Sequence, residues 1–199
     1  MSQIRGKQDA IQIAIEKLRG VDLAQRCALL DLPRPTDGSF PLRVFGRDYR
    51  FDTAALQLVR TDNGEPAKEY DLILVLHYLL YEAPLQPTGQ LITFRDFPGG
   101  QFYWQPFLSR TADPVVKRIG NDLDLLRKNL DRFDWEPYGA GDCGAKVHAL
   151  GKFHLYLIYH CGDEEFPPAA DVLFDSSVKR VYCAEDAAAL ASRICLSLL

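Results

Sequence analysis

His77 stands in the longest apolar run of the chain, from Leu72 to Tyr81. A buried imidazole needs a hydrogen-bond partner or a metal, because an unpaired polar group in apolar surroundings costs free energy. A neutral imidazole is also a competent axial ligand for the metal of a tetrapyrrole. His77 is therefore a candidate cofactor ligand, and a core histidine with a satisfied hydrogen bond is the alternative.

Aromatic residues are concentrated between Phe94 and Phe107, around a pair of adjacent glycines. Such glycines let a flat ligand approach the backbone, and Tyr and Trp side chains line pockets for ligands of this shape. The alternative is that these aromatic side chains build an ordinary core. The candidate cofactor-binding residues of this segment are Gly99, Gly100, Tyr103 and Trp104.

Carboxylates indicate a second possible chemistry. Three consecutive acidic residues follow a β-rich run and precede Phe166-Pro167-Pro168, so they form a turn with a rigid exit. Hard oxygen ligands bind divalent cations, and a buried carboxyl with a raised pKa serves as a general acid or base. A solvated acidic loop is the alternative, since the spacing is not that of a calcium loop. The candidate metal-binding residues are Asp142, Asp163, Glu164, Glu165 and Asp175.

A glycine motif, G-x-G-x-x-G, lies at positions 139–144. In dinucleotide-binding proteins this motif follows a strand and begins a helix. Here the preceding residues 135–138 are not predicted to be a strand, and Asp142 would meet the phosphates. We therefore expect a tight glycine turn.

The other histidines form no predicted metal site. His154 and His160 share one side of a strand but are about 20 Å apart at 3.3 Å per residue, so they cannot bind one metal. His148 is expected in a turn. No nucleophile motif stands near these positions, so no catalytic residue is nominated.

Residue periodicity predicts an α+β fold, with a mainly antiparallel sheet packed against helices in a single domain of residues 1–199. Helices are expected at 8–30, with a break at Gly20, and at 70–81, 122–133 and 184–199. A further helix start is expected at Asp113-Pro114. The expected strands are a hairpin in 40–59 turning at Gly46-Arg47-Asp48, and runs at 90–94, 153–160, 171–174 and 178–182. A second turn is expected at Asn63-Gly64.

Bulk composition narrows the class of protein. The chain has 199 residues, 47% of them hydrophobic, and a net charge of -4, which is typical of a globular protein and unsuited to a nucleic-acid partner. The polar segment Met1–Lys7 and the short apolar runs predict neither export nor a membrane span. Five scattered cysteines suit a reducing cytoplasm.

The residues also resemble a known family over nearly the whole chain. The specific part is Gly162-Asp163-Glu164-Glu165-Phe166-Pro167 followed by Leu173-Phe174-Asp175, and the weaker parts are Leu76-His77-Tyr78-Leu79-Leu80, Phe94-Arg95 with Pro98-Gly99-Gly100, Gly141-Asp142 and Glu185-Asp186. In this order they resemble domain-of-unknown-function family 3786. The resemblance implies anaerobic bacteria and archaea, where some members are fused to an iron–sulfur segment in corrinoid and one-carbon metabolism. Since it has no cysteine cluster, this chain should carry no iron–sulfur cluster.

Two functional hypotheses follow. The first is a binding or accessory protein of anaerobic metabolism that holds a tetrapyrrole, corrinoid or haem, between the aromatic segment and the helix of His77. The second is an enzyme that uses the acidic residues with a divalent cation. We favour the first, because no recognisable metal spacing supports the second. An adaptor that binds only a protein partner is a third possibility.

Overall fold

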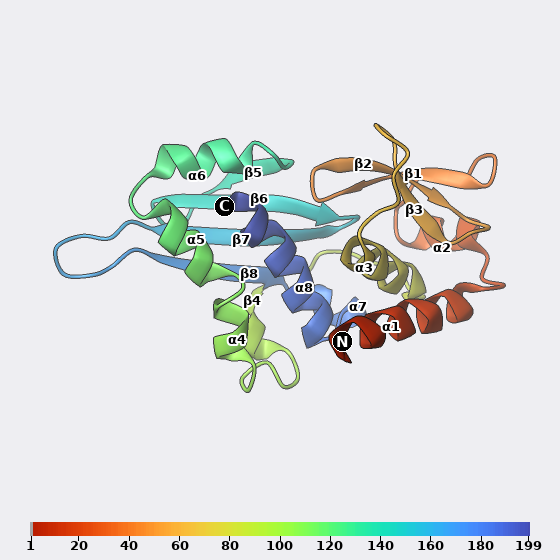
Figure 1. Ribbon diagram of the computed structural model, residues 1–199, viewed down its shortest axis with the longest axis horizontal. Coiled ribbons are helices and arrows are strands. Elements are labelled where there is room, and N and C mark those ends of the chain that lie inside the picture. The colour runs from red at the N-terminus through yellow and green to blue at the C-terminus, as the bar shows by residue number, and fades with distance from the viewer. Residues whose placement is uncertain (1) are drawn as a thin grey trace. The chain divides into compact units, whose positions relative to one another are not determined.

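The structure, a computed structural model, describes the backbone of residues 2–199 and the side chains of residues 8–199. The chain divides into two compact units: Met1–Gln86 with Leu150–Lys152, and Pro87–Ala149 with Phe153–Leu199. Each unit combines helices with antiparallel strands (Figure 1), which confirms the α+β class. The single domain expected from the sequence stays a prediction.

None of the helices that the structure describes has the length and apolarity of a membrane span. The argument against a signal peptide rests on residues 1–7, whose side chains lie outside the described residues.

The first unit carries three helices and a three-stranded antiparallel meander within its described residues. Its elements are α1 (Ser2–Leu18), α2 (Leu23–Leu29), β1 (Ser39–Val44), β2 (Arg47–Asp52), β3 (Gln57–Arg60) and α3 (Glu69–Leu80). Gly20 adopts a φ of 82° between α1 and α2, so the predicted helix break is confirmed. The helix α3 packs against α1 and α2.

The β1–β2 hairpin turns one residue earlier than predicted. Phe45 and Gly46 both have positive φ, 49° and 72°, as a two-residue type I′ turn requires. Val44 therefore pairs with Arg47, and Leu42 pairs with Tyr49. The predicted alternation is confirmed, because the apolar residues on both sides of the turn are buried.

The second unit contains a five-stranded sheet in the order β5-β6-β7-β8-β4. Its strands are β4 (Leu91–Thr93), β5 (Trp135–Tyr138), β6 (Cys143–Leu150), β7 (Phe153–His160) and β8 (Ala169–Asp175). Its helices are η1 (Phe94–Asp96), α4 (Trp104–Leu108), α5 (Ala112–Ile119), α6 (Leu123–Leu130), α7 (Val178–Val181), α8 (Ala184–Cys195) and η2 (Leu196–Leu198). The helix α5 packs on β8, and α8 contacts α5 and η1.

Three local predictions in this unit are wrong. Residues 135–138 form β5, which pairs with β6 and with no other of the described strands. One side of β5 therefore needs no hydrogen-bond donors, and Pro137, which has no N–H, is tolerated there. His148 lies in β6 and not in a turn, because Ala145, Val147 and Ala149 alternate inward. The segment 178–182 is the helix α7 and not a strand: Val178 and Tyr182, four residues apart, are both buried.

Candidate functional site

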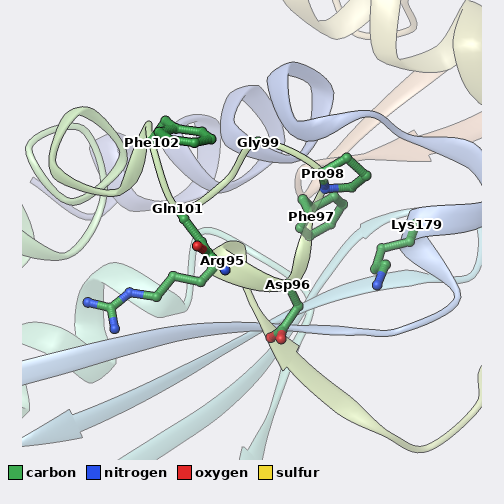
Figure 2. Close-up of a pocket in the computed structure, with 8 residues that line it drawn as sticks. All are labelled: Arg95, Asp96, Phe97, Pro98, Gly99, Gln101, Phe102 and Lys179. Carbon is green, nitrogen blue, oxygen red and sulfur yellow. The ribbon is translucent and has the colours of Figure 1, made fainter.

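One hollow in the second unit lies beside η1 and the loop that follows it. It encloses about 550 Å³, a volume within the usual range for small-molecule sites. Figure 2 shows its lining, which joins residues of the loop to one residue of α7. The lining residues are Arg95, Asp96, Phe97, Pro98, Gly99, Gln101, Phe102 and Lys179.

A capping box holds the start of η1. The carboxylate of Asp96 accepts hydrogen bonds from the Thr93 backbone N–H at 2.7 Å and from the Thr93 hydroxyl at 2.9 Å. These bonds lower the pKa of Asp96, and the nearby charge of Lys179 lowers it further. In Figure 2 the carboxylate lies between Arg95 on one side and Lys179 on the other. Asp96 therefore stays ionised and fixes the loop.

The two glycines of the loop have different roles. A Cβ at Gly100 would collide with the carbonyl oxygen of Phe94, so only glycine allows this close approach. Gly99 has a φ of 78° and nothing within 4 Å of a Cβ position. Gly99 therefore has open space beside its backbone, whereas the close approach at Gly100 is used by the fold itself. The binding of a flat ligand at these glycines stays a prediction.

The aromatic segment separates into a core and an exposed rim. Phe94 and Phe107 are buried and stack with ring centres 4.2 Å apart. Phe102 and Tyr103 are 88% and 60% exposed. The Arg95 guanidinium lies 4.4 Å from the ring centre of Trp104, a cation–π contact that orients the cation. The core interpretation therefore holds for Phe94 and Phe107, and the ligand-binding role of the exposed part of the segment stays a prediction.

His77 lies in the first unit, whereas the four candidate residues of the aromatic segment lie in the second. The surrounding helix α3 is apolar as expected, with Leu74, Val75, Leu76, Tyr78 and Leu79 all buried. The His77 ring itself is only half-buried. Solvent can therefore satisfy part of its hydrogen bonding, which weakens the argument that a ligand must do so. Its role as a cofactor ligand stays a prediction.

Two of the acidic candidates accept backbone hydrogen bonds in the loops that follow β5 and β7. Asp142 accepts a hydrogen bond from the Cys161 N–H at 2.8 Å, and Asp163 accepts from the N–H groups of Glu165 and Phe166, both at 2.8 Å. The latter bonds lower the pKa of Asp163. Glu164 and Glu165 are exposed.

Asp175 is separated from the other acidic residues by the length of β8. The acidic loop enters β8 at Ala169, and six residues at about 3.3 Å each give about 20 Å to Asp175. Within the described residues, no three His, Cys, Asp or Glu side chains are grouped closely enough to hold a metal ion. The five acidic candidates are therefore not brought into one cluster, and their cation-binding role stays a prediction.

The glycine motif at 139–144 is the tight turn that was expected. It joins β5 to β6, so a strand follows it where a dinucleotide site needs a helix. Gly141 has a φ of 66°, and a Cβ there would lie 2.5 Å from the carbonyl oxygen of Tyr159. The glycines therefore serve the close packing of a hairpin.

Sequence reasoning missed Arg95, Phe102 and Lys179 as lining residues of the hollow. Arg95 and Phe102 lie inside the aromatic segment, where a cation next to exposed rings was an available signal. Lys179 was assigned to a strand, and nothing in the sequence places it beside residues more than 75 positions earlier.

Comparison with protein families gives one finding. A sequence model of the family described as domain of unknown function DUF3786 matches residues 22–197. Comparison with curated proteins and with solved structures gave no match.

Proposed function

This chain belongs to the DUF3786 family, and we propose that it is a binding or accessory protein that holds a planar, anionic cofactor in the hollow beside η1. The observation that carries the proposal is the combination, around one hollow, of the exposed ring of Phe102, open backbone at Gly99 and the cationic side chains of Arg95 and Lys179. A tetrapyrrole, either haem or a corrinoid, is the ligand class that we propose. The anaerobic setting implied by the resemblance favours the same class.

Two cations support an anionic ligand. Arg95 and Lys179 both line the hollow, while the one acid there, Asp96, is already engaged by Thr93. Arg95 is held over Trp104 at 4.4 Å and so is partly oriented before a ligand arrives. Carboxylates at the edge of a haem are suited to such cations, because charge-assisted hydrogen bonds are the stronger ones.

The shape of the rim supports a flat ligand. Phe102 exposes 88% of its surface, and leaving a large ring in water forfeits about 2 kcal/mol of burial free energy. A planar macrocycle that stacks on Phe102 recovers this energy and also covers the open backbone at Gly99. A small polar substrate would leave most of the ring exposed.

His77 is a separate proposal, made for the first unit alone. We propose it as a ligand for the metal of a tetrapyrrole, independently of the hollow beside η1, because a neutral imidazole on an apolar helix is a competent ligand for such a metal. The variant His77→Ala should stay folded, bind added haem or corrinoid more weakly and lose the ligation-dependent shift of the visible spectrum. If His77→Ala instead lowers Tm and leaves binding unchanged, His77 is a core residue and the proposed hollow is unaffected.

Titration of the protein with haem and with cobalamin tests the hollow. We expect saturable binding by the wild type and at least about 10-fold weaker binding of either cofactor by Phe102→Ala. For haem, whose edge carries carboxylates, Lys179→Gln should also weaken binding at least about 10-fold, and each loss corresponds to about 1.4 kcal/mol. Matched controls are Phe166→Ala, which removes a ring that is 67% exposed in the acidic loop, and Lys128→Gln on α6. Equal losses in the controls, or no saturable binding by the wild type, would contradict the proposal.

A further inference from the structure

A second, smaller hollow lies on the sheet of the second unit, over β5, β6 and β7. It encloses about 240 Å³, and its lining residues are Asp134, Trp135, Glu136, Lys146, His148 and His154. In β6, His148 lies between the buried residues Val147 and Ala149; in β7, His154 lies between Phe153 and Leu155, also buried. Because alternate residues of a strand face opposite sides, both imidazoles lie on the outward side of the sheet.

The two histidines stand on β6 and β7, which are neighbouring strands of the sheet (Figure 1). Their ring centres are 5.3 Å apart, with the ring planes inclined at 67°. The backbone N–H of His148 donates a hydrogen bond of 2.8 Å to the Asp134 carbonyl oxygen, so the segment before β5 is fixed against β6 at this point. The pair is therefore positioned by the sheet itself.

This separation, which is also that of an edge-to-face ring contact, is compatible with a shared metal ion. A Zn–N bond is about 2.0–2.1 Å and a ring nitrogen is about 1.1 Å from its ring centre, so each ring centre would be about 3.2 Å from the ion. At a tetrahedral angle of about 109°, two such ring centres are about 5.2 Å apart. The observed 5.3 Å agrees with this value.

The charges around the pair permit a cation. The Glu136 carboxylate and the Lys146 ammonium group form an ion pair of 2.6 Å across β5 and β6, so their charges offset each other. Asp134 adds a further acidic side chain to the lining. The local charge therefore does not oppose a divalent ion.

We propose that His148 and His154 form a two-imidazole site for a divalent transition metal of the cobalt-to-zinc group. Nitrogen ligands select these ions over magnesium and calcium, which prefer oxygen. The protein supplies two ligands, one fewer than a typical catalytic zinc centre, and water or a small ligand in the hollow fills the other coordination positions. The site is independent of the hollow beside η1, so each proposal stands or fails separately.

Titration with Zn²⁺ by calorimetry, and with Co²⁺ by visible absorption, tests the site. We expect one saturable equivalent of Zn²⁺, and for Co²⁺ the intense absorption bands of tetrahedral coordination. His148→Gln and His154→Gln should each weaken Zn²⁺ binding at least about 10-fold. Mg²⁺ should not compete.

The matched control is His160→Gln, which removes an imidazole from the far end of β7. All variants keep the five cysteines, so any metal bound by thiols is the same in each. Circular dichroism and Tm show whether each variant folds. Where a glutamine variant does not fold, the alanine variant at the same position takes its place. Unchanged Zn²⁺ binding in folded variants of both histidines, an equal loss in His160→Gln, or no saturable binding at millimolar Zn²⁺ would overturn the proposal.

Discussion

Asp175 offers the sharpest test of the structure, because a single carboxylate ties two loops to the end of β8. Its side chain accepts hydrogen bonds from the Thr88 N–H and hydroxyl, both at 3.0 Å, from the Gly89 N–H at 2.7 Å and from the Ser177 N–H at 2.9 Å. The residue is only 5% exposed. We therefore expect Asp175→Asn, which keeps the shape and removes the charge, to destabilise the protein.

The magnitude follows from the ionisation of Asp175. Burial alone would raise its pKa, but the hydrogen bonds from Ser177, Thr88 and Gly89 outweigh burial and lower the pKa from 3.8 to about 2. Since a tenfold change in proton affinity corresponds to about 1.4 kcal/mol, the ionised form contributes about 2 kcal/mol to folding at neutral pH. In Asp175→Asn, the amide NH₂ group also faces a backbone N–H, and two donors cannot form a hydrogen bond. We therefore expect the free energy of unfolding to fall by about 2–3 kcal/mol in total.

The sign of the pH dependence is fixed by the lowered pKa. The contribution of Asp175 is complete above about pH 5, falls to about half near pH 3, and disappears below the folded-state pKa. Urea unfolding of wild type and Asp175→Asn at pH 7 and pH 3 should therefore show a difference in unfolding free energy that shrinks with acidity. The control is Asp171→Asn, an exposed position on the same strand. Equal stabilities at pH 7, or a difference that does not change with pH, would refute this reasoning.

Two further changes test the fold and the acidic loop. Gly151→Ala should lower the free energy of unfolding by about 2 kcal/mol more than Gly64→Ala does. Both glycines have positive φ, but only a Cβ at Gly151 collides with the Tyr78 ring. Equal losses of stability in thermal or urea unfolding would contradict this. The cation hypothesis for the acidic loop requires that Mg²⁺ or Ca²⁺ raise the Tm of the wild type and not that of the double variant Glu164→Gln, Glu165→Gln. Equal melting of the wild type in chelator and in excess metal would remove that hypothesis.

Local patterns in the sequence were sufficient where an element's own residues decide its structure. The run at 153–160 is rich in β-branched and aromatic residues and forms β7 with the predicted bounds. Apolar residues at helical spacing and a glycine break predicted the two N-terminal helices, and an apolar run ending before Pro84 predicted α3. The turn at the glycine motif is also decided locally, because the backbone at Gly141 has a positive φ that glycine adopts readily.

Tertiary pairing decided the remaining elements. The segment around Pro137 is a strand only because β6 lies beside it and its other edge is unpaired. The residues at 178–182 suit a strand or a helix, and the chain becomes helical after Asp175 binds the Ser177 N–H and turns the backbone.

Both candidate sites depend on residues that only the fold brings together. Lys179 reaches the hollow beside Arg95 from a helix 84 positions later in the chain, and the imidazoles of His148 and His154 meet because their strands are neighbours in the sheet. The sequence by itself determined which side chains were available for chemistry. Their distances depended on strand register and loop closure, and these are set by long-range packing that no local pattern specifies.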